Sequence, residues 1–190
     1  VIATASNLIS DLFPIWETIA KNLYLLKIHK ELGVKRTEYP SYSSVVSNNI
    51  KAGFYDASHP FLTDSNIAAL DSIIKDSYDQ LFTFGGLNLF VQKYCKRLED
   101  QLLELPQHVY MRAAIHLMWK DGIESVIAKY YQLAEHAVTE ATPKIVNSLA
   151  PNAALFSCCL TRPSDSQEGI NESINMLTRE SKYSGGCAWD

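Results

Sequence analysis

The stretch LPQHVYMRAAIHLMWKDGIESVIAKYYQLAEHA, residues 105–137, decides the fold class of this chain. Pro106 suits the first position of a helix, and Gly122 divides the stretch into two segments. In the second segment, apolar residues recur at spacings of three and four, as on the buried face of an amphipathic helix. The pattern predicts two helices, residues 106–119 and 123–137, packed as an antiparallel hairpin.

Helical periodicity also extends upstream of this hairpin. Residues 14–32 carry apolar side chains at helical spacing and stop at Gly33, and Thr63 is suited to cap a further helix. A short helix is expected to end near Gly53, and the apolar residues between Phe84 and Leu98 trace one face of a helix over residues 78–98. Residues 1–140 are therefore expected to form a mainly α-helical N-terminal region.

The pattern changes after residue 140. Thr142 and Pro143 halt the helix, and residues 155–160 are a short apolar run suited to a buried strand. A polar turn follows, and residues 169–181 read as a helix with Ile170, Ile174 and Leu177 facing inward. Because the backbone groups of one short strand need neighbouring strands, residues 141–190 are interpreted as the start of a larger α/β domain, truncated at the C-terminal end.

Charge and hydropathy exclude two broad classes of protein. The chain has 17 Lys plus Arg against 21 Asp plus Glu, a formal net charge of −4, and no basic block. Bulk attraction to a nucleic-acid backbone is therefore not expected. Uninterrupted apolar runs reach only three or four residues, far below the roughly 20 that cross a bilayer. The sequence predicts no nucleic-acid partner and no membrane span.

The four cysteines indicate a reducing compartment, for which the cytoplasm is the default. Cys95, Cys158, Cys159 and Cys187 form no CxxC pair, and no His has metal-ligand spacing, so no metal site is expected. Cys95 fits the apolar face of its helix. Cys158 is open to two interpretations, a buried thiol or a redox donor. A redox partner would be remote, since Cys159 points to the opposite face of the strand.

Polar residues concentrate at the expected strand and helix ends of residues 142–186, where ligand sites are commonly assembled. Backbone donors near Thr142 and Pro143, or near Gly169, could hold an anion, and Gly186 would let the backbone approach a flat ligand closely. Asp165 and Lys182 could equally be solvated charges at a turn and a helix end.

Five segments, in this order and at this spacing, give the chain a resemblance to a known family. They are Leu105–Ala114 (LPQHVYMRAA), Ala141–Pro143, Phe156–Cys158, Asp165–Ile170 (DSQEGI) and Ser181–Gly186 (SKYSGG). The chain resembles the N-terminal portion of the large, catalytic alpha subunit of class I ribonucleotide reductases. The match is specific over residues 76–186 and looser over residues 7–74.

The resemblance implies a fold and a chemistry. The helical N-terminal region would lead into the first strand and helix of a ten-stranded α/β barrel. In the family, a thiyl radical removes the 3′ hydrogen of a ribonucleoside diphosphate, and two further cysteines reduce the ribose while forming a disulfide. Cys158 aligns with one of this redox-active pair. The radical cysteine, the second cysteine of the pair and the C-terminal thiols lie outside this chain, which alone is an incomplete enzyme.

The resemblance also implies binding sites. Thr142, Pro143, Ser157 and Gly186 would contact substrate, since hydroxyl and backbone groups can hydrogen-bond to phosphate and sugar. Asp165, Ser166, Gln167 and Lys182 fall where the family binds its allosteric effector, a deoxynucleoside triphosphate or ATP. A carboxylate can accept a hydrogen bond from a sugar hydroxyl, and an ammonium group can face a phosphate.

The expected partners are those of the parent enzyme, which supplies deoxyribonucleotides for DNA replication. They are a metal-containing small (beta) subunit that supplies the radical, a second large subunit, and a thioredoxin- or glutaredoxin-type reductant. No cofactor would bind this chain directly. The alternative is a catalytically degenerate relative that serves as a nucleotide-sensing or protein-interaction module.

Overall fold

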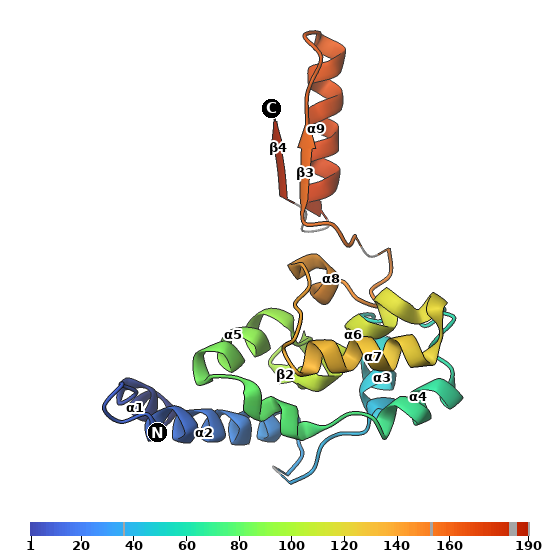
Figure 1. Ribbon diagram of the computed structural model, residues 1–190. Helices are drawn as coiled ribbons and strands as arrows, with labels where there is room; N and C mark the ends of the chain where they lie inside the picture. Colours follow the sequence, from blue (N-terminus) through green and yellow to red (C-terminus); the bar gives the residue numbers. More distant parts are fainter. Residues whose placement is uncertain (36, 153, 183–185, 190) are drawn as a thin grey trace.

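The computed structural model describes residues 1–35, 37–152, 154–182 and 186–189. A helical body forms the broad base, and a strand–helix–strand unit rises from it as a narrow column (Figure 1). The body contains α1 (Ile2–Asn7), α2 (Ile15–Glu31), α3 (Tyr42–Lys51), α4 (Asp64–Asp71), η1 (Asp76–Leu81), α5 (Phe84–Tyr94), β1 (Arg97–Leu98), β2 (Gln101–Leu102), α6 (Pro106–Met118), η2 (Trp119–Asp121), α7 (Ile123–Ala134) and α8 (Thr142–Val146). The unit contains β3 (Cys158–Thr161), α9 (Gln167–Lys182) and β4 (Gly186–Trp189).

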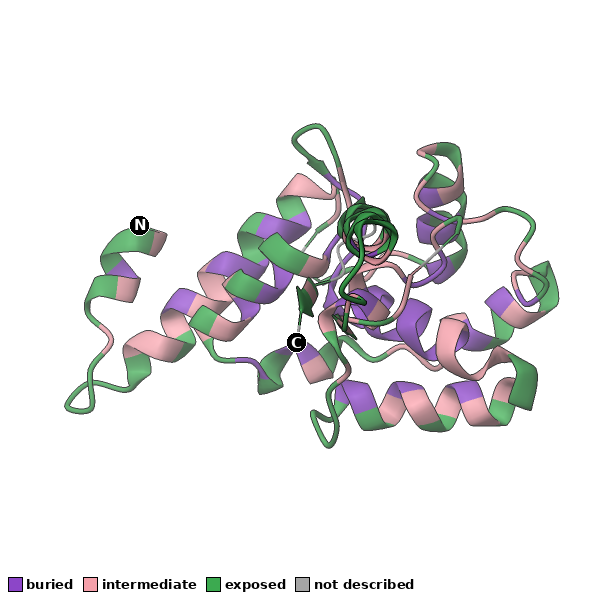
Figure 2. Ribbon diagram, turned by 90° about the horizontal axis from the view of Figure 1, so that it is seen from above, coloured by how far each residue is buried: buried purple, intermediate pink, exposed green. Residues whose placement is uncertain are grey.

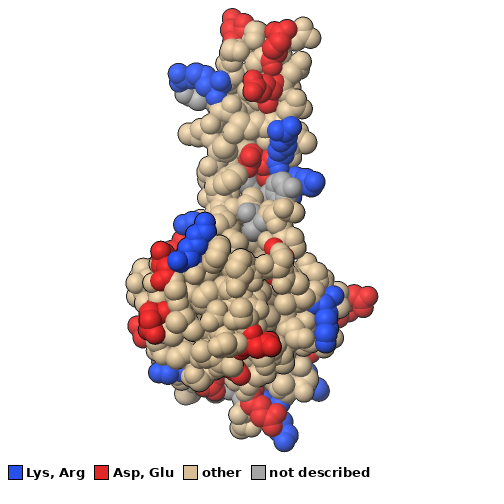
Figure 3. All heavy atoms as spheres, turned by 90° about the vertical axis from the view of Figure 1, so that its right-hand side faces the viewer, with Lys and Arg blue, Asp and Glu red and all other residues tan. Residues whose placement is uncertain are grey.

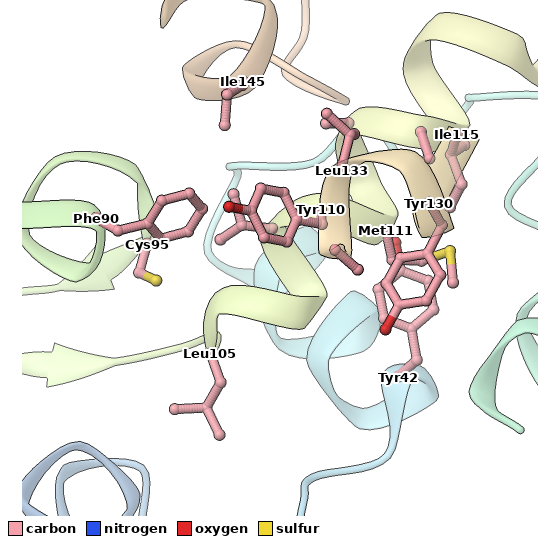
Figure 4. Packing of buried hydrophobic residues seen from close by; sticks show 14 of the residues in the cluster. Tyr42, Phe90, Cys95, Leu105, Tyr110, Met111, Ile115, Tyr130, Leu133 and Ile145 are labelled. Carbon is pink, nitrogen blue, oxygen red and sulfur yellow. The ribbon is translucent and has the colours of Figure 1, made fainter. Parts of the chain in front are cut away.

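Helix α6 is the centre of the body. Its residues from Pro106 to Ile115 are all buried, and α6 packs along α7, which confirms the expected hairpin. The surrounding core is rich in aromatic and aliphatic side chains, among them Tyr42, Tyr110 and Tyr130 (Figure 4). Burial of this apolar surface is the main stabilising contribution to the body. The mainly helical fold of the N-terminal region is therefore confirmed.

Local sequence signals account for several of the helix ends. Ser41, Thr63 and Thr83 each accept a hydrogen bond from the backbone N–H three residues further on, at 3.0–3.3 Å, which satisfies a donor in the first turn. Gly33 and Gly53 follow α2 and α3 with φ of +80° and +76°, a region that glycine adopts without strain. The Thr63 cap and the stops at Gly33 and Gly53 lie where the sequence predicts them, whereas the Ser41 and Thr83 caps were not predicted.

The helix expected over residues 78–98 is shorter than predicted. Residues Asp76–Leu81 form a 3-10 helix, and α5 ends at Tyr94, since Cys95 adopts an extended backbone with ψ of 133°. The backbone N–H of Lys96 then donates to the buried carboxylate of Glu104 at 2.8 Å, which turns the chain into the β1–β2 hairpin. Leu98, placed on the helix face from its spacing, lies in β1 and is 48% exposed.

Two further ends differ from the sequence-based expectation around residue 140. Helix α7 stops at Ala134, and His136 takes a left-handed backbone with φ of +57°. Thr142 and Pro143 therefore do not end the preceding helix, as expected from the sequence; they begin α8, because proline is compatible with a first helical turn. Ile145 of α8 joins the core of the body. The division into domains at residues 140 and 141 stays a prediction.

The β3–α9–β4 unit is a parallel strand pair with α9 as the connection. A strand near residues 155–160 and a helix near 169–181 are confirmed. Strand β4, which begins at Gly186, was not predicted, because the Gly-Gly sequence reads as a break. The expected burial is wrong, because Leu160 is 77% exposed and Ile170 and Ile174 are each 45% exposed. Helix α9, viewed along its axis in Figure 2, is exposed over most of its circumference.

Two strands with one helix bury only one face of a sheet, so the apolar residues on the other face stay accessible. The continuation into a ten-stranded barrel stays a prediction. In the described part of the chain, no helix combines the length and the apolar character that a membrane span requires.

Candidate functional site

The thiol of Cys158 stands at the start of β3 and is exposed. Its partner in the strand register is Gly186, whose backbone N–H donates to the carbonyl of Ser157 at 2.7 Å. A Cβ at Gly186 would lie only 3.1 Å from that carbonyl oxygen, so the close approach favours glycine. Ser157, Cys158 and Gly186 are therefore brought together where the two strands begin.

Thr142 and Pro143 lie in the helical body, at the start of α8. The hydroxyl groups of Thr142 and Tyr94 are 3.3 Å apart and share a hydrogen bond, and Pro143 is buried. Both strands of the unit begin at its end nearest the body, and α8 lies on the side of the body that faces the unit (Figure 1). The two groups of proposed substrate residues thus belong to different parts of the fold.

The other end of α8 is held by two cations. Arg112 donates to the carbonyls of Ile145 and Val146, and Lys96 donates to that of Val146 at 2.8 Å. Cations stabilise the carbonyl end of a helix. Desolvation, followed by the charge of Arg112, lowers the pKa of Lys96 to about 8, although Glu104 opposes the shift. Helix α8, and with it Thr142, is therefore fixed at both ends.

A buried ion pair underlies this arrangement. Arg112 and Glu104 have side chains that are 0% exposed, with Nη2 and Oε1 3.1 Å apart. Tyr55 donates to Glu104 at 2.6 Å, and Arg112 donates to the carbonyl of Tyr94 at 2.7 Å. This ion pair was not predicted from the sequence. The available signal was two opposite charges within residues 102–115, a stretch without another Asp, Glu, Lys or Arg.

The residues proposed for effector binding lie at the two ends of α9. The Ser166 hydroxyl accepts from the backbone N–H of Gly169 at 3.0 Å and so caps the helix, while Asp165 and Gln167 are exposed beside it. Lys182 is in the last turn, about 22 Å further along the helix axis at 1.5 Å per residue. Within this chain, the structure does not gather all four residues at one place.

A cavity of about 530 Å³ opens beside α5, α6 and the connection that leads to α8. Its wall is aromatic, with Phe82, Phe90, Tyr94, Tyr110 and His136 among its lining residues. The ring centroids of Phe82 and His136 are 4.5 Å apart, and desolvation lowers the pKa of His136. This hollow adjoins Thr142 through the Tyr94 side chain.

On the face shown in Figure 3, acidic and basic side chains are interspersed, so this face has no large patch of one charge that would suggest a further binding surface. Within the described ranges, no three His, Cys, Asp or Glu side chains are grouped so that they could hold a metal ion. The described residues therefore offer an exposed thiol with hydroxyl and backbone donors beside it in the β3–α9–β4 unit, and an aromatic hollow near Thr142 in the helical body.

Several known proteins are similar to this chain. Residues 80–153 match the family described as ribonucleotide reductase, all-alpha domain. The chain is 29% identical to a ribonucleoside-diphosphate reductase subunit alpha of Treponema pallidum over 98% of its own length and 23% of the relative. It is also 29% identical to the subunit alpha of Helicobacter pylori, over its full length and 24% of the relative.

A third relative is the ribonucleoside-diphosphate reductase large chain of Encephalitozoon cuniculi, 35% identical over 62% of this chain and 15% of the relative. The chain thus spans a quarter or less of the length of these relatives. The domain match and the similarity over nearly all of its residues support identifying the chain as similar to the N-terminal portion of ribonucleotide reductase large subunits.

Proposed function

We propose that this chain is the N-terminal part of a ribonucleoside-diphosphate reductase, an oxidoreductase that converts ribonucleotides to deoxyribonucleotides for DNA synthesis. The exposed Cys158 thiol, on the strand that follows the family's all-alpha domain, is the observation that carries this proposal. The names of the relatives support a reductase over a catalytically degenerate nucleotide-sensing or interaction module.

Cys158 would be one of two thiols that supply the electrons. After a thiyl radical elsewhere in the enzyme removes the 3′ hydrogen, the 2′ hydroxyl leaves as water. Cys158 and a second cysteine, outside this chain, give two electrons and two protons and become a disulfide. The 3′ hydrogen then returns to the sugar and regenerates the thiyl radical. A reductant restores the two thiols.

The residues around Cys158 would bind and orient the substrate. The hydroxyls of Ser157 and Thr142 both donate and accept hydrogen bonds, so they suit phosphate or sugar oxygens. Backbone groups at Pro143 and Gly186 would approach the same substrate. Because Thr142 belongs to α8 and Ser157 precedes β3, substrate would lie between the helical body and the β3–α9–β4 unit.

The remaining proposals concern regulation and assembly. Asp165, Ser166 and Gln167 at one end of α9 would contact a deoxynucleoside triphosphate or ATP effector. Lys182 at the other end would meet an effector held by a second large subunit. A radical-supplying small subunit and a thioredoxin- or glutaredoxin-type reductant complete the proposed assembly, and the cytoplasm is the proposed compartment.

The test is deoxynucleotide formation by the complete large subunit with its small subunit, before and after Cys158→Ser. The serine variant should lose turnover by at least about a thousandfold with a small dithiol as reductant, because a hydroxyl cannot form the disulfide. Undiminished turnover would overturn the assignment of Cys158.

Cys159→Ser is the matched control, since it changes the adjacent thiol on the other face of β3. This variant should retain turnover within about twofold of the unmodified enzyme. Loss of turnover in Cys159→Ser, together with retention in Cys158→Ser, would transfer the redox role to the neighbouring residue.

A further inference from the structure

Two cysteines lie directly opposite each other across the β3–β4 pair. Cys159 and Cys187 are partners in the parallel register. Neighbouring strands lie about 4.8 Å apart. Disulfide-linked Cα atoms are usually about 4.4–6.8 Å apart, so the register places this pair within bonding range. Both thiols are reduced and half-buried in the structure.

Both side chains project from the face of the sheet that α9 covers. Thr161 follows Cys159 by two positions and therefore points the same way, and its hydroxyl is 3.5 Å from that of Ser173 on α9. Opposed residues on paired strands share one face, so Cys187 lies beneath α9 as well. Cys158 alternates to the other face and is exposed.

The electrostatic environment of Cys187 agrees with this placement. Its pKa is raised first by desolvation and next by the charge of Cys159, ahead of the smaller effects of Glu180 and Cys158. Among the charged groups that affect Cys187, its register partner Cys159 therefore has the largest effect. Cys95, the remaining thiol, is buried in the core of the helical body.

We propose that Cys159 and Cys187 form a reversible disulfide in response to low-molecular-weight disulfides such as oxidised glutathione. One thiolate of the pair attacks oxidised glutathione, forms a mixed disulfide and releases one glutathione thiolate. The second thiolate displaces the other glutathione. Two protein thiols are thereby oxidised by two electrons, and their two protons pass to the two glutathione thiols.

This thiol pair is separate from the proposed redox role of Cys158, which needs a cysteine outside the chain. The bond would tie β3 to β4 beneath α9 and leave the Cys158 face of the sheet open.

The experiment is treatment of the native chain with oxidised glutathione, followed by thiol titration and mapping of disulfide-linked peptides. The expected result is the loss of two of the four thiols per chain and a single intramolecular link between Cys159 and Cys187. Dithiothreitol should restore both thiols. A link from Cys158 to either residue, a link between chains, or glutathione adducts alone would overturn the proposal.

Variants and a denatured control make the result specific. Cys158→Ser should leave the link intact, whereas Cys159→Ser should leave Cys187 reduced or singly glutathionylated. In denaturant the preference for one pair should disappear, because the strand register then no longer selects the partner. Equal yields of the 159–187 link in native and denatured protein would also count against the proposal. None of these readouts depends on reductase activity.

Discussion

Arg112 and Glu104 form an ion pair that is fully enclosed by the protein, with both side chains 0% exposed. Desolvation alone would lower the pKa of Arg112, but the charges of Glu104 and Tyr55 and a hydrogen bond to Glu104 raise it above its ordinary value. The guanidinium also donates to carbonyls at the ends of α5 and α8. The cost of removing each charge from water is therefore compensated only while both partners are present.

Arg112→Met should destabilise the chain by about 3–5 kcal/mol, because it leaves the Glu104 carboxylate buried without its cation. The same change removes the donors to the carbonyls of Tyr94 and Ile145. The free energy of unfolding from a urea titration, followed by circular dichroism, measures the loss.

A double-mutant cycle provides the control for this prediction. Glu104→Gln combined with Arg112→Met should cost less than the sum of the two single changes, by about 1–3 kcal/mol, since no unpaired charge remains. Strict additivity would mean that the two side chains do not interact and would contradict the ion pair.

His108 should make the body less stable in mild acid. Burial lowers its pKa from 6.5 to about 4, although the hydrogen bond to Pro40 opposes the shift. Its Nδ1 accepts from the backbone N–H of Leu105 and Nε2 donates to the Pro40 carbonyl, each at 3.0 Å, so the neutral ring is satisfied. The unfolded state binds this proton more tightly, so stability is lost as pH falls from about 6.5 to 4, by on the order of 3 kcal/mol.

The pH dependence of His108 can be separated from that of other histidines. His59, His116 and His136 also have lowered pKa values, with desolvation as the largest cause, and contribute in the same direction. His108→Gln removes the titrating ring but keeps an amide donor near Pro40. Unfolding titrations at pH 7 and pH 4.5 should show a smaller difference for this variant, and an unchanged difference would refute the assignment.

Gly169 in the first turn of α9 should not tolerate alanine. An added Cβ would lie 2.0 Å from the Ser164 hydroxyl and 2.9 Å from its carbonyl oxygen. This clash should cost about 1–3 kcal/mol, more than the roughly 1 kcal/mol that alanine gains in helix propensity. Hydrogen exchange of α9 amides should accelerate in Gly169→Ala.

Gly85→Ala is the control, because nothing lies within 4 Å of its added Cβ. This variant should leave the hydrogen exchange of the amides in its own helix, α5, unchanged or slower.

The helical body was predictable from the sequence where signals were local. Thr63, Gly33 and Pro106 mark helix ends because capping, backbone conformation and proline geometry act within one turn. The end of α5 was not predictable in this way. Leu98 continues the helical spacing, but a carboxylate eight residues beyond Lys96, that of Glu104, draws the backbone out of the helix.

Only part of the candidate site could be predicted from the sequence. Alternation along β3 separates Cys158 from Cys159, as the sequence indicates. The partnership of Cys159 with Cys187 depends on the register of two strands separated by α9, and spacing alone does not reveal it. The same holds for Tyr94 and Thr142, whose contact depends on how α8 packs against α5.

The contact between Tyr94 and Thr142 gives a kinetic prediction for the complete reductase. Thr142→Val keeps the side-chain shape but removes the hydroxyl, and it should raise KM for the ribonucleoside diphosphate by about fivefold, the equivalent of one hydrogen bond, with little change in kcat. Tyr94→Phe should have a smaller effect on KM, since it only releases the Thr142 hydroxyl from its 3.3 Å partner. Thr18→Val, at an exposed position on α2, is the control and should change neither constant. Steady-state kinetics with saturating effector measures both constants, and an unaltered KM for Thr142→Val would remove this residue from the proposed substrate site.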